Sequence, residues 1–210
     1  MQLRAMAKIN LGLDVVRKRE DGYHEVRMIM QTIHLFDRIH IKKTKEPGIK
    51  LTTNLSYLPV NEDNLVYQSA KRLMDEFHLE GGLDIKLDKR IPVAAGMAGG
   101  STDAASCMLA INDLYGLGLS KRHLMKRGVK LGADIPYCIL KGTALSEGIG
   151  EKLSTIPAMP SCYILIAKPN IHVSTKWVYT NLVLDEHTNH PDIDGMLASM
   201  KKRDLLSLSN

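Results

Sequence analysis

The sequence predicts an α+β fold in two domains, a complete amino-terminal domain over residues 1–155 and a partial second domain over residues 156–210. Apolar and polar residues alternate through much of the first third, as in strands, and helical spacing of apolar residues dominates the middle. Two prolines within Leu153–Ser161 mark the expected border. Only one convincing strand follows it, and an isolated strand leaves its hydrogen-bonding edges unpaired. The second domain is therefore expected to be incomplete.

The amino-terminal elements follow from periodicity and from residues that start or break helices. Strands are expected around Ala5–Val16, Ile33–Ile41 and Ile49–Thr53, where apolar and β-branched residues alternate. The elements expected next are a helix from Leu65 to Phe77 capped by Asp63 or Asn64, a break at Gly81-Gly82 and a short strand from Leu83 to Leu87.

A glycine- and alanine-rich loop over Ile91–Ala105 is the most informative segment, and it leads into a helix expected to begin near Ser101. Its glycines at 96, 99 and 100 allow the backbone to approach a ligand closely. The free amides and the positive dipole end of the helix suit a phosphate. The loop is neither a P-loop nor a G-x-G-x-x-G fingerprint. The alternative is an ordinary glycine-rich turn with Ser101 as a simple N-cap.

Helices and one strand are expected in the rest of the chain. The helix after the loop places Ala104, Ala105, Met108, Leu109, Ile111 and Leu114 on a buried stripe. The later elements are a helix capped by Ser120, the strand Cys162–Ala167, a helix capped by Ser174, a polar loop over Asp185–Asp192 and helical chain to the end, with an apolar group at Leu205, Leu206 and Leu208.

The composition, 44% hydrophobic and 24% charged residues, is that of an ordinary soluble globular protein. The formal charge is +5, but the basic residues are scattered, which favours a solvated surface over nucleic-acid binding. Cys107, Cys138 and Cys162 lack zinc or disulfide spacing and are expected to be reduced core thiols. Without a signal peptide or a run of membrane-spanning length, the sequence predicts a cytoplasmic protein with no membrane association.

Three further segments carry candidate functional residues. Lys8 and Asn10 fall two apart on a strand and so share one face, although an exposed polar edge is the alternative. Tyr23 and His24 follow a turn signal, where a functionless hairpin tip is equally expected. Asp134 lies between apolar residues, where a carboxylate needs a partner or serves as a helix cap.

Together with the loop, these segments resemble the GHMP kinases in order and spacing. The family's loop, Pro-x-x-x-Gly-Leu-x-Gly-Gly-Ser-Ser-x-Ala, is matched by Pro92–Ala104. The Ala-Lys-Ile-Asn-Leu and Asp-Gly-Tyr-His segments are similar to a narrower group of members. That group phosphorylates the 2-hydroxyl of 4-diphosphocytidyl-2-C-methyl-D-erythritol in the non-mevalonate pathway to isopentenyl diphosphate. The resemblance implies a two-domain GHMP kinase fold that uses ATP and Mg²⁺.

The resemblance also implies a role for individual residues. Asp134 would accept the hydroxyl proton, while Lys8 would orient it and neutralise charge on the transferred phosphate. The ATP phosphates would be wrapped by Pro92, Val93, Ala94, Ala95, Gly96, Met97, Ala98, Gly99, Gly100, Ser101, Thr102 and Asp103.

The implied substrate-binding residues are Asn10 for the methylerythritol end and Tyr23, His24 and Tyr179 for the cytosine. Aromatic faces stack on the base, and a histidine ring offers both a donor and an acceptor to its edge. Met30 stands where some relatives carry an aromatic residue, which predicts a softer wall to this pocket.

The chain departs from the family pattern at its loop and at its end. Met97 and Thr102 replace the usual Leu and Ser, which are mild changes. Nothing after Gly150 resembles the family's third, glycine- and serine-rich motif. A fragment or a natural truncation is therefore expected, and with it the alternative of a non-catalytic nucleotide-binding module. A GHMP kinase for another small alcohol is the second alternative; it would have no use for Tyr23 and His24.

Overall fold

The computed structural model describes residues 1–169, 171 and 173–202, and its contacts divide the chain into two compact units. Strands β1 (Gln2–Lys18) and β2 (His24–Thr44) run through both units. Unit 1 comprises Met1–Ala7, Ile33–Val93 and Met97–Leu140, and unit 2 comprises Lys8–Thr32, Ala94–Gly96 and Lys141–Asn210. The sequence-based border between residues 155 and 156 stays a prediction.

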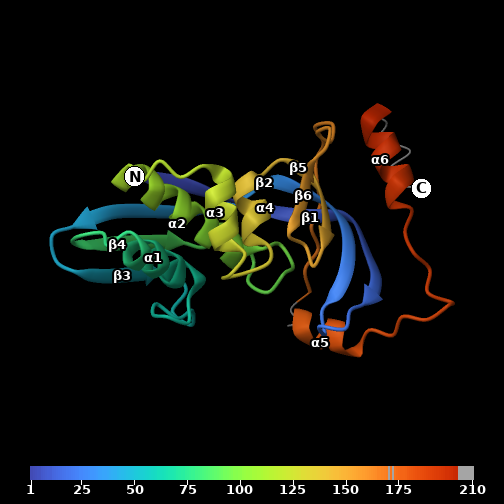
Figure 1. The fold of residues 1–210 in the computed structure, drawn as a ribbon, viewed down its shortest axis with the longest axis horizontal. Coiled ribbons are helices and arrows are strands. Elements are labelled where there is room, and N and C mark those ends of the chain that lie inside the picture. Colours follow the sequence, from blue (N-terminus) through green and yellow to red (C-terminus); the bar gives the residue numbers. More distant parts are fainter. Residues whose placement is uncertain (170, 172, 203–210) are drawn as a thin grey trace. The chain divides into compact units, whose positions relative to one another are not determined.

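Unit 1 contains a β-α-β crossover. Strand β3 (Gly48–Thr53) pairs in parallel with β4 (Gly82–Asp88), and helix α1 (Leu65–Glu76) connects them (Figure 1). The carboxyl-terminal part of β2 pairs antiparallel with β4, from Arg38 opposite Asp88 to Thr44 opposite Gly82. The Asn64 side chain caps α1 by accepting a hydrogen bond from Val66 N at 2.9 Å, so the second of the two predicted caps is confirmed.

Helices α2 (Gly99–Tyr115), α3 (Lys121–Gly128) and α4 (Ile135–Leu140) complete unit 1. Helix α2 packs against α1, α3 and α4. Four residues of the predicted stripe are buried and two, Leu109 and Leu114, are half-buried, whereas Thr102, Ser106 and Cys107 are buried outside the stripe. Ser120 caps α3 as predicted. A helix that packs against three others is expected to be apolar on nearly all sides. The small residues of α2 allow this close packing.

Unit 2 is a sheet covered by a carboxyl-terminal helix. The amino-terminal part of β2 pairs antiparallel with β5 (Thr143–Gly148), and β5 pairs antiparallel with β6 (Lys152–Thr155) (Figure 1). Strand β1 also pairs with β2. Helix α6 (Ile193–Lys202) buries its apolar side chains against Ile29, Leu11 and Leu145.

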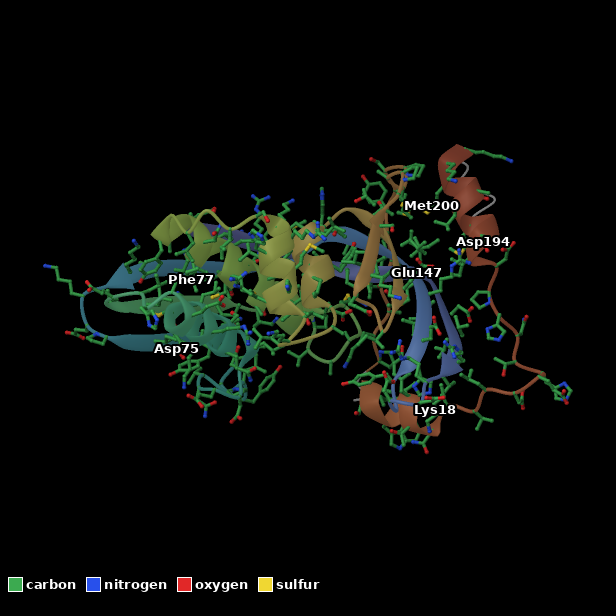
Figure 2. All side chains as sticks on the ribbon, viewed as in Figure 1. Lys18, Asp75, Phe77, Glu147, Asp194 and Met200 are labelled. Carbon is green, nitrogen blue, oxygen red and sulfur yellow. The ribbon has the colours of Figure 1, made fainter. Side chains whose placement is uncertain are left out.

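Two contacts fix α6 on the sheet. Arg27 donates two hydrogen bonds to the carboxylate of Asp194, at 2.8 and 2.6 Å. The Arg27 guanidinium also forms an ion pair with Glu147, and both carboxylates are labelled in Figure 2. Gly12 allows the helix to approach, since a Cβ atom there would lie 2.7 Å from the Sδ of Met196.

The segment Cys162–Ala167 is not the buried strand that the sequence predicts. These residues are irregular and exposed, with Tyr163 and Leu165 at 106% and 96% exposure. A strand needs a neighbour to satisfy its backbone, and within the described residues no strand pairs with this segment. Cys162 is consequently exposed, so the prediction of three core thiols is wrong for this residue and confirmed for Cys107 and Cys138.

The last predicted elements are confirmed where the structure describes them. Ser174 caps α5 (Thr175–Asn181), a loop without helix or strand runs through Asp185–Asp192, and α6 follows. The apolar group at Leu205, Leu206 and Leu208 lies outside the described residues. Among the described helices, none combines the length and the apolar character needed to cross a membrane.

Candidate functional site

The glycine loop leaves the end of β4 and enters α2 through residues in the left-handed region. Ala94, Gly96 and Ala98 have φ of 54°, 69° and 54°. Ala98 is the N-cap of α2, without a side-chain hydrogen bond, and the helix begins at Gly99. The predicted start near Ser101 is therefore two residues late, and Ser101 is not the cap. Because no side chain caps this end, the first amides of α2 are free to bind an anion.

The residues of the predicted loop differ in exposure. Pro92, Val93, Ala94, Gly96 and Gly100 are exposed, as expected of residues that meet a ligand. The half-buried members are Ala95, Ala98, Gly99 and Ser101, and the buried members are Met97, Thr102 and Asp103.

Asp103 is turned inward. Its Oδ2 accepts a hydrogen bond from Lys89 Nζ at 2.7 Å. Burial raises the pKa of Asp103 well above its usual range, although Lys89 opposes the shift. Burial alone would lower the pKa of Lys89, but the charges and hydrogen bonds of Asp103 and Asp37 outweigh it and raise that pKa. Asp103 therefore contributes to the base of the loop.

Asp134 lies in unit 1, in the segment that joins α3 to α4. It immediately precedes α4, is half-buried, and its carbonyl accepts a hydrogen bond from Cys138 N at 3.0 Å. Its carboxylate has no hydrogen-bond or ion-pair partner among the described residues. A Cβ atom on the nearby Gly132 would lie 3.9 Å from Ser101 Oγ, so this segment borders the first turn of α2. The chain thus has an uncommitted carboxylate in the segment that borders the first turn of α2.

Lys8 and Asn10 share a face of β1 in unit 2, as predicted. Lys8 Nζ donates to Asn10 Oδ1 at 3.1 Å. Lys8 is only 5% exposed, so the alternative of an exposed polar edge is wrong for it. It forms no ion pair within the part of the chain that the structure describes. A buried ammonium without a counter-charge favours the binding of an anion.

Two of the three predicted cytosine-binding residues lie together in unit 2. The ring centroids of His24 and Tyr179 are 5.2 Å apart, with the planes at 42°. Tyr23 is 61% exposed, whereas His24 is buried. The Asp21 carboxylate accepts from Tyr23 N at 3.1 Å and from the Arg19 guanidinium, which orders the turn. A stacking face and an imidazole edge at one place can recognise a flat heteroaromatic group.

The chain is similar to known proteins along its length. The model of the GHMP kinases N terminal domain matches residues 64–142. A Lachnoclostridium phytofermentans protein named 4-diphosphocytidyl-2-C-methyl-D-erythritol kinase is 58% identical over 210 residues, which are 100% of this chain and 72% of the relative. The chain belongs to the GHMP kinase family.

Further similarities support this assignment. A Lachnospira eligens protein of the same name is 53% identical to this GHMP kinase over 98% of the chain and 71% of the relative. The crystal structure of a 4-(cytidine 5'-diphospho)-2C-methyl-D-erythritol kinase matches with a TM-score of 0.80 and 31% identity, over 96% of this chain and 72% of that one. The predicted fold class, an α+β GHMP kinase fold, is confirmed.

Sequence reasoning missed three residues beneath the loop of this GHMP kinase. Asp37 and Asn54 accept hydrogen bonds from the backbone of the segment that leads into the loop. Lys89, which belongs to that segment, donates from its side chain to Asp37 and Asp103. Asp37 gave a signal, because a carboxylate interrupts the apolar pattern of Ile33–Ile41. Lys89 gave none, since a lysine at a strand end is usually solvated.

Proposed function

We propose that this GHMP kinase transfers a phosphoryl group from ATP to the 2-hydroxyl of 4-diphosphocytidyl-2-C-methyl-D-erythritol. The observation that carries the proposal is 58% identity, over the whole chain, to a protein named as the kinase of that compound. The pairing of His24 with Tyr179 supports a base-binding end.

The amino end of α2 is the proposed ATP-phosphate site. The uncapped amides after Ala98 fit an anion, and Gly100 leaves room, because its nearest non-local atom to a Cβ is Leu65 Cδ1 at 3.6 Å. When bound, ATP supplies the transferred group and Mg²⁺ balances its charge. The described residues contain no cluster of three or more His, Cys, Asp or Glu side chains that could hold a metal.

Asp134 is the proposed general base. Phosphoryl transfer requires mainly positioning and charge stabilisation, with a carboxylate to receive the hydroxyl proton. Asp134 is accessible and is not committed to another group in its unit, so it is available to take that proton. Lys8 supplies a positive charge for the developing negative charge, and its bond to Asn10 orients the ammonium.

Substrate selection is assigned to unit 2. Tyr23 and Tyr179 offer aromatic faces to cytosine, His24 bonds to the base edge, and Asn10 holds the methylerythritol end. The alternative of another small alcohol has no observation in its favour. The alternative of a non-catalytic module rests on the lack of a glycine- and serine-rich segment after Gly150, and turnover by the chain decides it. A cytoplasmic location and the absence of nucleic-acid partners belong to the same proposal.

A substrate panel tests the proposed function. ADP release by the 210-residue chain is measured with ATP, Mg²⁺ and either 4-diphosphocytidyl-2-C-methyl-D-erythritol, mevalonate or homoserine. Turnover of the first compound alone is expected. Turnover of another alcohol would contradict the substrate assignment, and binding of ATP and CDP without any turnover would contradict catalysis by this chain.

A further inference from the structure

A buried cluster of charges lies at the base of the glycine loop, entirely within unit 1. Lys89 Nζ donates to Asp37 Oδ2 and, at 2.7 Å, to Asp103 Oδ2. The side chains of Asp37, Lys89 and Asp103 are 0%, 5% and 2% exposed. The cluster joins three elements, because Asp37 is on β2, Lys89 follows β4 and Asp103 is on α2.

The cluster connects the two stems of the loop. Lys89 precedes residues 92–98 and Asp103 follows them, so their ion pair closes the base of the loop. Asp37 Oδ1 also accepts hydrogen bonds from the amides of Arg90 and Ile91, the latter at 2.8 Å. Asn54 holds the same stem, because its Oδ1 accepts from Lys89 N at 2.8 Å and its Nδ2 donates to Lys89 O at 3.1 Å.

The ammonium of Lys89 also lies against the start of α2. A Cβ atom on Gly99 would be 3.1 Å from Lys89 Nζ and 3.3 Å from Ile91 Cγ2. The first residue of the helix therefore rests directly on the cluster, and a shift of Lys89 would shift the amides that follow Ala98.

A gain in folding stability is not needed to explain this arrangement. Replacing a whole buried ion cluster with apolar residues of similar size is often neutral or stabilising, because the desolvation of the charges offsets their attraction. Here two carboxylates share one ammonium, and Asp103 Oδ1 has no hydrogen-bond partner among the described residues. A costly group at the base of a ligand-binding loop is better explained by what it holds in place.

We propose that Asp37, Lys89 and Asp103 are positioning residues that hold both stems of the loop and keep the first turn of α2 arranged for the phosphates of ATP. The nature of the ligand rests on the proposed function. Amides that are already arranged bind without the cost of ordering the loop, so the cluster acts on ATP affinity through the loop.

A triple variant separates positioning from folding. Asp37→Asn, Lys89→Met and Asp103→Leu together remove all three charges without leaving one unpaired, so the melting temperature is expected to stay within a few degrees of the unmutated chain. Amide hydrogen exchange at Thr102, whose N–H bonds to Ala98 O at 2.8 Å, is expected to rise at least about tenfold. ATP affinity by calorimetry should fall at least about tenfold, while CDP affinity is unchanged.

Two single variants complete the experiment. Asp103→Asn keeps an acceptor for Lys89 and should retain ATP affinity within about threefold. Lys42→Met is the matched control, because Lys42 forms an exposed ion pair with Asp84 across the same two strands, at 3.1 Å. It should change neither exchange nor ATP affinity.

The outcomes separate this inference from the proposed function. An exchange rate at Thr102 in the triple variant equal to that in the unmutated chain would overturn the positioning role. So would faster exchange that extends equally to Ile111 with a matching loss of melting temperature, because the cluster would then serve folding alone. Failure of the unmutated chain to bind ATP contradicts the proposed function, and the exchange measurements still decide the role of the cluster.

Discussion

At the scale of single residues, Asp134 and Lys8 share one property: each is a charged group left without an opposite charge among the described residues. Sequence reasoning identified both from their matched positions, and the structure adds that Lys8 is buried and that Asp134 is half-buried in the segment that borders the first turn of α2. Uncompensated charge at such places is typical of sites completed by a ligand.

Asp134→Asn tests the general base. The substitution keeps the shape and removes the basicity, so kcat should fall about 100-fold or more while ATP and CDP affinities are kept. Asp113→Asn is the control, because Asp113 is exposed near the other end of α2. Near-normal turnover of the Asp134 variant would exclude the role.

Tyr23 and His24 are expected to act differently on base selection. When UDP binds to the unmutated chain, the base-edge group of His24 is left unpaired, at a cost of roughly 1–3 kcal/mol. His24→Ala removes that group and should therefore narrow the preference for CDP over UDP. Tyr23→Ala should weaken the binding of both CDP and UDP, since stacking does not depend on base identity. Competition titrations measure both effects. Equal CDP and UDP affinity in the unmutated chain would contradict the cytosine pocket.

At the scale of elements, most of the fold could be predicted because the signals were local. Alternation marked the strands through Ile33–Ile41 and Ile49–Thr53, and Asn64, Ser120 and Ser174 cap their helices as predicted. Two failures have one cause. A strand at Cys162–Ala167 would need a distant neighbour, which the described residues do not supply, and the start of α2 depends on an alanine, Ala98, held in a left-handed conformation. Local propensity encodes neither.

The candidate site was predictable to the same extent. The exposed loop, the pair of Lys8 with Asn10, and His24 follow from short motifs, whereas Tyr179, which pairs with His24, was placed only by the family resemblance. The cluster beneath the loop does not follow from such motifs, since Asp37 and Lys89 are 52 residues apart and meet only through the pairing of β2 with β4.

The contact between β1 and α6 gives a prediction at this scale. In Gly12→Val the new side chain meets Met196 Sδ and Ile193 Cδ1, at 2.7 and 2.9 Å from its Cβ, and should destabilise the chain by about 1–3 kcal/mol. Met196→Ala should recover part of that loss when the two are combined, because it opens the space. Denaturant unfolding of the four chains measures the coupling, and purely additive losses would show that the contact does not limit the packing of α6.

At the scale of the whole molecule, thiol reactivity reports on the core. Ellman's reagent should modify one thiol rapidly in the native chain, namely Cys162, which is exposed. Cys107 and Cys138 should react only on unfolding, since both are buried and burial raises the pKa of Cys107 to about 12. Cys162→Ser should abolish the rapid phase. A remaining rapid phase would show that the core opens easily.

Asp103 is expected to make the folded chain less stable as the pH rises. Its pKa is raised in the folded chain, so between about pH 3.9 and that raised value the folded state holds a proton that the unfolded state has released. This contribution to stability is complete below about pH 3.9 and is lost as the pH rises through the raised pKa. The melting temperature of Asp103→Asn, relative to the unmutated chain, should therefore increase from pH 4 to pH 8. A constant difference would show that Asp103 is not proton-linked.

The packing of α6 on the sheet has a consequence during synthesis. Arg27 and Asp194, which join the two, are 167 residues apart, and Ile29 and Leu11 have their apolar cover in α6. At about 5–20 residues per second, the ribosome needs roughly 10 to 30 s between these points. For that interval the nascent sheet presents an uncovered apolar face, which is the kind of surface that chaperones bind while translation continues.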